Sequence, residues 1–124
     1  MLHYTHNIQN IGDKAISGGE KSILNGSDIY INNAEIGITS KDLSILTFDN
    51  ITINDSKVAF CAFQKKPEYG PGFIEVKEIV FNNVEVPHLI EEKSELILNG
   101  ISKDFTLGKI EDMLYGIKYG KSSK

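Results

Sequence analysis

The residues best suited to bind a ligand gather in the polar segment Gln64–Gly72 (QKKPEYGPG) and at the dipeptide Lys41-Asp42. Together they offer an aromatic ring, several hydrogen-bond donors and a carboxylate, a mixture suited to recognising carbohydrate. The predicted contact residues are Lys41, Asp42, Gln64, Lys65, Lys66, Glu68 and Tyr69. A segment that projects from the fold without binding a ligand is the alternative interpretation.

Catalytic chemistry on polysaccharides finds little support in the same residues. Glycoside hydrolysis requires two carboxyl groups that flank the scissile bond. A lyase requires a base and a cation that neutralises a uronate, and the candidates are Lys41, Lys65 and Lys66. Lysine becomes a base only when it is buried, which a projecting loop does not provide. We therefore expect no catalytic residues in this chain.

Histidine and cysteine do not form a recognisable site either. His3 and His6 are close in sequence but are accompanied by no cysteine or carboxylate cluster, so we expect no metal and no cofactor. Cys61 lies in the apolar stretch AFCAF and is predicted to be a small buried hydrophobic residue.

A repeat of 22 residues must position these groups. Gly19–Ile38 aligns without a gap on Lys41–Phe60, so that Ile31 falls on Ile53 and Asn32 on Asn54. Short Ile-x-Ile pieces alternate apolar and polar residues, as strands with one buried face do. The alignment also pairs Asp28 with Asn50 and Ser27 with Asp49, so it offers no carboxylate pair there. Glu35, Lys57 and Glu85 share another position of the repeat and indicate alternating surface charge.

The third repeat, Ala59–Val86, is longer, and the match returns only when six residues are looped out within or near Gln64–Gly72. Phe81 and Asn82 then fall on Ile53 and Asn54, and His88 falls on Phe60 as a turn or edge residue. In a fourth, incomplete repeat, Leu96, Leu98 and Ile101 follow Ile74, Val76 and Ile79. Low-twenties periods are typical of solenoids, in which stacked repeats bury a continuous core.

The end of the chain changes pattern. Helical spacing of Ile110, Met113, Leu114 and Ile117 predicts an amphipathic helix within 106–120 that covers the last repeat. The expected organisation is therefore a stack of repeats over 1–105, a capping helix over 106–120 and a disordered tail over 121–124.

The register of Asn32, Asn54 and Asn82, followed by Asn33, Asp55 and Asn83, resembles that of the pectin-lyase-like family. The resemblance covers roughly residues 8–101 and implies an all-β fold, a right-handed parallel β-helix of about four turns in which stacked asparagines form an amide ladder. Enzymes of that family cleave or epimerise acidic polysaccharides, and other members bind them or serve as stalks. The arginine that its lyases often use is absent here, since all 13 basic residues are lysine.

Composition narrows the range of partners. The 124 residues carry a net charge of −4, which argues against nucleic acid, and no apolar run is long enough for membrane insertion. The chain begins within a repeat, so we expect it to be part of a longer solenoid. An exposed N-terminal turn predicts a homodimer formed through that turn. The localisation is left open; it would be secreted or cell-surface if the parent chain carries a signal.

Two functions follow as expectations. The first is a non-catalytic scaffold or polysaccharide-binding module of a larger carbohydrate-related protein. The second is a fragment of a polysaccharide lyase or glycoside hydrolase whose other catalytic residues lie upstream.

Overall fold

The computed structural model describes residues 6–106, 110 and 113, and this part of the chain is mostly strand. Its strands are β1 (His6–Gly18), β2 (Ile23–Gly26), β3 (Ile29–Lys41), β4 (Ile45–Phe63), β5 (Phe73–Ile90), β6 (Glu95–Leu98) and β7 (Ile101–Ser102). They belong to one largely parallel sheet in the order β1-β3-β4-β5-β6-β7, with β2 paired to β4. The predicted all-β class is therefore confirmed.

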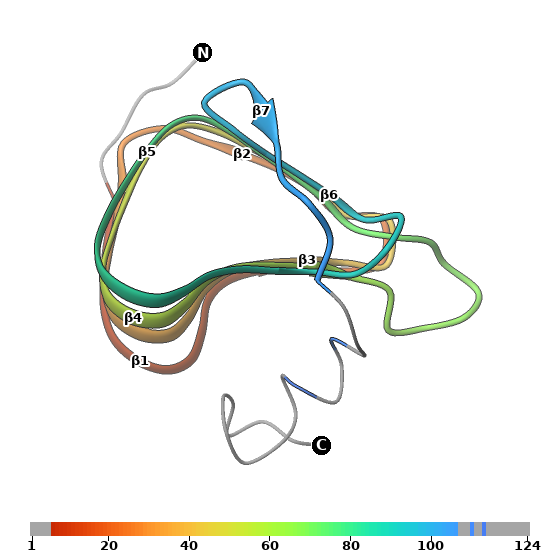
Figure 1. Cartoon of the computed structure of the whole chain (residues 1–124), viewed down its shortest axis with the longest axis horizontal. Helices are drawn as coiled ribbons and strands as arrows, with labels where there is room; N and C mark the ends of the chain where they lie inside the picture. The colour runs from red at the N-terminus through yellow and green to blue at the C-terminus, as the bar shows by residue number, and fades with distance from the viewer. Residues whose placement is uncertain (1–5, 107–109, 111–112, 114–124) are drawn as a thin grey trace.

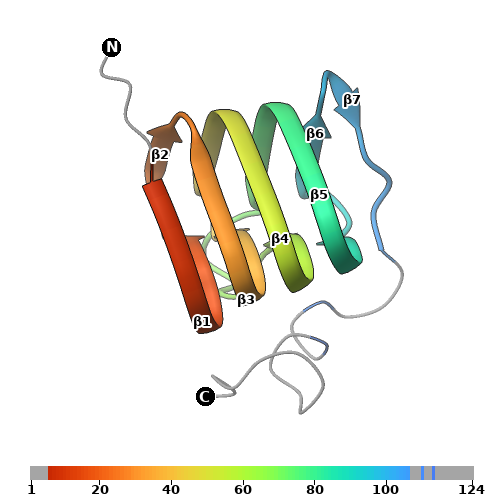
Figure 2. The same ribbon diagram turned by 90° about the vertical axis from the view of Figure 1, so that its left-hand side faces the viewer.

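The strands pair in the register that the sequence repeat predicts. Ile31 pairs with Ile53, and Ile53 pairs with Phe81, each in a parallel ladder. Paired residues are 22 apart between β3 and β4 and 28 apart between β4 and β5, so the longer third repeat rejoins the ladder after its insertion. Figure 2 shows β1, β3, β4 and β5 lying side by side.

The long strands bend sharply, and they bend at the same place. Asn33, Asp55 and Asn83 have φ of 58°, 51° and 58°. This left-handed backbone region is one that asparagine and aspartate enter more readily than other non-glycine residues. β3, β4 and β5 consequently follow nearly the same curved path in Figure 1, and β1 bends beside them, where its pairing with β3 shifts register between Ile11 and Lys14.

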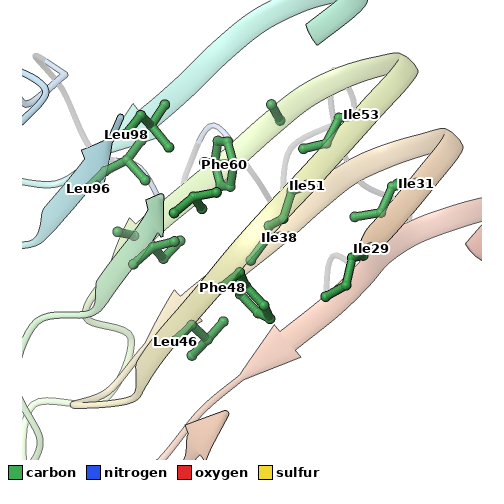
Figure 3. Close-up of a cluster of buried hydrophobic side chains, with 14 of the residues drawn as sticks. Ile29, Ile31, Ile38, Leu46, Phe48, Ile51, Ile53, Phe60, Leu96 and Leu98 are labelled. Atoms are coloured by element: carbon green, nitrogen blue, oxygen red, sulfur yellow. The ribbon is translucent and has the colours of Figure 1, made fainter. Parts of the chain in front are cut away.

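The main core lies inside this curve. Side chains from β3, β4 and β6, including Ile31, Ile53, Phe60 and Leu96, point toward one another there (Figure 3). Ile31, Ile53, Phe60 and Leu96 are fully buried. Because each such side chain stabilises the fold by about 1.5–3 kcal/mol, the stacked interior explains why one repeat needs its neighbours.

A second apolar cluster lies apart from this core. Cys61 and Phe63 are buried in it with Ile110, and Met113 packs against it. The remaining members are Ile36, Val58, Val86 and Leu89. Cys61 is therefore the buried residue that its sequence context predicts.

The helix predicted over 106–120 is not seen in the described part of the chain, and nearly all of it, like the tail 121–124, lies outside the described residues. Within the described residues the last repeat ends in a hairpin. Asn99 and Gly100 have φ of 53° and 79°, the two-residue turn that favours a hairpin, and β7 turns back antiparallel to β6. Ile101 consequently pairs with Leu98 and is 60% exposed, so the expectation that it continues the repeat after Ile79 is wrong.

Candidate functional site

The corner that carries the predicted site is built from a four-residue turn. The N–H of Ser22 donates to the carbonyl of Gly19, Ser44 to Lys41, and Ser94 to Glu91, at 3.1, 3.1 and 2.9 Å. In the third repeat the insertion Gln64–Gly72 takes the place of this turn. The loop therefore leaves the sheet where the other repeats turn a corner, as the sequence predicts.

Asp42 connects the loop to the corner of the preceding repeat. Its side chain is fully buried, and its Oδ1 accepts the N–H groups of Lys65 and Lys66, both at 2.8 Å. Its Oδ2 has no hydrogen-bond partner among the described residues. The carboxylate thus holds the first residues of the loop and is not open to solvent.

Gln64 holds the loop from within. Its Nε2 donates to the carbonyls of Lys66, Pro67 and Tyr69 at 3.1, 3.2 and 2.8 Å. Its backbone N–H donates to Oε1 of Glu91 at 2.9 Å. Gln64 is therefore a structural residue of the loop.

The tip of the loop reaches across to the first repeat. Lys66 forms an ion pair with Glu20, and the ammonium of Lys21 lies 5.9 Å from the centre of the Tyr69 ring. The hydrogen bond to Glu20 raises the pKa of Lys66. The Tyr69 ring is half-buried beside an ammonium group of the chain itself, and Glu68 is exposed.

Lys41 lies at the same corner. Its side chain is half-buried and passes close to the Gly19 backbone. Burial, and then the ammonium groups of Lys65 and Lys14, lower the pKa of Lys41. The structure thus brings all seven predicted residues together, but Asp42, Gln64, Lys66 and Tyr69 contact other parts of the chain.

The asparagine column forms a ladder across three repeats. Asn54 donates its side-chain amide to Oδ1 of Asn32 at 2.6 Å, and Asn82 donates to Oδ1 of Asn54 at 2.8 Å. In the next column, Asn83 donates to Oδ1 of Asp55 at 2.8 Å. Each amide contributes a net stabilisation on the order of 1 kcal/mol and fixes the register of the bend.

Beside this bend lies a polar groove of about 950 Å³. It crosses four neighbouring strands and is lined by Gly12, Asn33, Ala34, Glu35, Asp55, Ser56, Lys57, Asn83 and Glu85. The Lys57 ammonium lies 3.3 Å from a carboxylate oxygen of Glu35. Asp55, Lys57, Asn83 and Glu85 are exposed. The groove therefore presents amides and charges to solvent, one repeat after another.

The sequence alone does not mark the groove as a site, because Glu35, Lys57 and Glu85 align as alternating charges of the kind found on any protein surface. The sequence feature that could have indicated the groove is the column Asn33, Asp55 and Asn83. Asparagine and aspartate enter the left-handed backbone region readily, so such a column marks a bend, and a bend can border a hollow.

No group of three or more histidine, cysteine, aspartate or glutamate side chains in the described ranges is arranged to hold a metal ion. Over the same residues no helix is long and apolar enough to cross a membrane. No family model, no curated protein and no solved structure matches this chain.

Proposed function

We propose that the chain is a right-handed parallel β-helix and serves as a non-catalytic, polysaccharide-binding module of a larger protein. The parallel pairing of equivalent residues, the shared bends and the asparagine ladder support this architecture. The resemblance to the pectin-lyase-like family agrees with these features.

The groove beside the bend is the observation that carries the proposed function. It is open and polar, and it runs across the repeats, so equivalent side chains recur about every 4.8 Å along it. A linear glycan is also a repeating polar chain, with hydroxyl groups that amides and carboxylates bind well. The loop Gln64–Gly72 stays a second predicted contact point.

The carboxylates of the groove favour binding over hydrolysis. A general acid needs a carboxyl group whose pKa is raised, usually by removal from water. Asp55 and Glu85 are exposed, and Glu35 is neutralised by Lys57. None of these environments resembles the apolar pocket of such an acid.

Titration calorimetry against a panel of soluble glycan oligomers tests the proposal. Lys57→Ala should weaken binding of neutral glycans about five- to tenfold, because it removes a hydrogen-bond donor from the groove. Lys77→Ala is the matched control, since Lys77 also forms an exposed ion pair with a neighbouring repeat, with Asp49 at 3.6 Å. Equal loss in both variants, or no binding to any glycan, would refute the groove as the site.

Tyr69→Ala separates the groove from the loop. If the groove alone carries binding, this variant binds glycan as the unmodified chain does. A loss confined to Tyr69→Ala would instead assign the site to the loop.

A fragment of a glycosidase or lyase is the second candidate. Glu35 and Glu85 are two repeats apart, about 9.6 Å by strand spacing, close to the roughly 6.5–9.5 Å that separates the carboxyl groups of inverting glycosidases. Turnover of a glycan that the groove binds, abolished by Glu85→Gln, would favour this candidate over the first.

A further inference from the structure

The charges of the groove are unevenly distributed. Three carboxylates, those of Glu35, Asp55 and Glu85, face a single ammonium, that of Lys57. Lys57 is paired with Glu35 at 3.3 Å, and Asp55 accepts a hydrogen bond from Asn83 at 2.8 Å. The groove therefore keeps an excess of negative charge after its internal pairs are formed.

Glu85 is the group most available to a ligand. Its side chain is exposed, and within residues 6–106 no ion pair is seen for it. It lies in β5, next to the strand β4 that carries Lys57 and Asp55. A cationic group in the groove would meet the Glu85 carboxylate one strand spacing, about 4.8 Å, from the level of Asp55.

From this arrangement we infer that the groove takes a linear glycan whose sugars carry free amino groups. This inference rests on the proposed polysaccharide-binding function and names its ligand class. Ammonium groups form charge-assisted hydrogen bonds with carboxylates, which are about twice as strong as neutral ones. A polyuronate would instead bring like charges against Asp55 and Glu85, and such contacts select against a ligand. The preference is thus opposite in charge to the acidic polysaccharides that the family resemblance implies.

Two hexamers of equal length test the inference, one of glucosamine and one of N-acetylglucosamine. They differ in charge at the amino nitrogen and share the same linkage. Calorimetry should give a Kd at least tenfold lower for the glucosamine hexamer, and added salt should reduce this difference. A galacturonate hexamer should bind more weakly than either.

A single carboxylate should account for much of the difference. Glu85→Gln should weaken binding of the glucosamine hexamer about three- to tenfold and leave the acetylated hexamer unchanged. Glu78→Gln is the control, because Glu78 is an exposed glutamate on the same strand, outside the groove. Equal effects of the two variants would overturn the role of Glu85.

The outcomes distinguish the inference from the function on which it depends. Equal binding of both amino-sugar hexamers, or tighter binding of the galacturonate hexamer, overturns the inference and leaves glycan binding intact. Failure of all three hexamers and of the wider glycan panel overturns the proposed function itself.

Discussion

At the scale of single residues, Asp42 combines an unusual backbone conformation, two hydrogen bonds and complete burial. It lies in the left-handed region with φ of 53°, its Oδ1 accepts two backbone N–H groups of the loop, and it is fully buried. Aspartate meets both demands, because it tolerates this backbone conformation and supplies a charged acceptor. A residue singled out for ligand contact is thus a fixed part of the fold.

Asp42→Ala should lower the free energy of unfolding by about 2–4 kcal/mol, because two partly buried N–H groups lose their charged acceptor and alanine tolerates the left-handed conformation poorly. Asp42→Asn keeps one acceptor oxygen and should cost about 1 kcal/mol. Urea denaturation measures both, with Glu92→Ala as the control, since Glu92 is an exposed residue of the corresponding corner turn. An equal, small effect of all three would contradict the role of Asp42.

His88 predicts how stability depends on pH. It pairs with Phe60 of the neighbouring strand, and its Nδ1 is buried with no hydrogen-bond partner among the described residues. Burial, and then the ammonium of Lys103, lower the pKa of His88, whereas the carboxylate of Asp104 raises it. The unfolded chain therefore binds the proton more readily than the folded one. Stability should be full above the ordinary histidine pKa of about 6.5 and fall below it, by at most about 1.4 kcal/mol per pH unit.

His88→Gln removes the titrating group and should flatten this part of the profile. Urea denaturation at several pH values between about 7 and 5, for both proteins, measures the difference. A parallel decline in both proteins would assign the effect to other groups.

At the scale of elements, two segments outside the strands hold the repeats together. The loop Gln64–Gly72 contacts the corners of the first two repeats through Glu20, Lys21 and Asp42. Ile110 and Met113 pack against the outer cluster around Cys61. Both segments thus cover the side of the strand stack. Its end is covered by β7 together with Lys103–Thr106. There the N–H of Lys103 donates to the carbonyl of Leu96, and the N–H of Thr106 donates to the carbonyl of Ile90.

Ile110→Ala should make Cys61 reactive. Cys61 is buried and its pKa is raised by desolvation, so it should react slowly with a disulfide reagent in the unmodified chain. Loss of the Ile110 side chain opens its cover and should raise the reaction rate at least tenfold, with a loss of about 2–4 kcal/mol in stability.

Ile101→Ala is the control for this experiment, because Ile101 is a mostly exposed isoleucine. Thiol labelling below the unfolding transition measures the rate in each variant. Equal rates for the two variants would mean that Ile110 does not cover Cys61.

At the scale of the whole molecule, the two ends of the sheet differ. The C-terminal end is turned back by the antiparallel β7, whereas β1 pairs only with β3 among the described strands. An unpaired strand edge can recruit another strand. We therefore keep the prediction of a homodimer through the first repeat.

Light scattering should then show a dimer at micromolar concentration. Ser17→Lys should raise the dissociation constant of the dimer at least tenfold. Ser17 is an exposed residue of β1, and a lysine on an edge strand disfavours pairing with another strand. Asn50→Lys is the control, because Asn50 is an exposed residue of β4, a strand inside the sheet. A monomer at all concentrations contradicts the prediction.

The strand register could be predicted from the sequence, because equivalent aliphatic residues must share one interior and only a 22-residue shift aligns them. The insertion was equally visible, because its prolines and glycines cannot continue a ladder. The return of β7 was not predicted, although Asn99-Gly100 is a strong hairpin signal. The groove was not predicted because it depends on how the bends of four strands are arranged, which no single repeat specifies.

The six extra residues of the third repeat leave the pairing of β4 with β5 undisturbed on both sides of the corner. The loop at this corner can therefore be longer than in the other repeats without changing the strand pairing. Foreign peptides of different lengths could be inserted for display between Pro67 and Glu68, the two exposed residues of the loop, because this point leaves the hydrogen bonds of Asp42 to Lys65 and Lys66 in place.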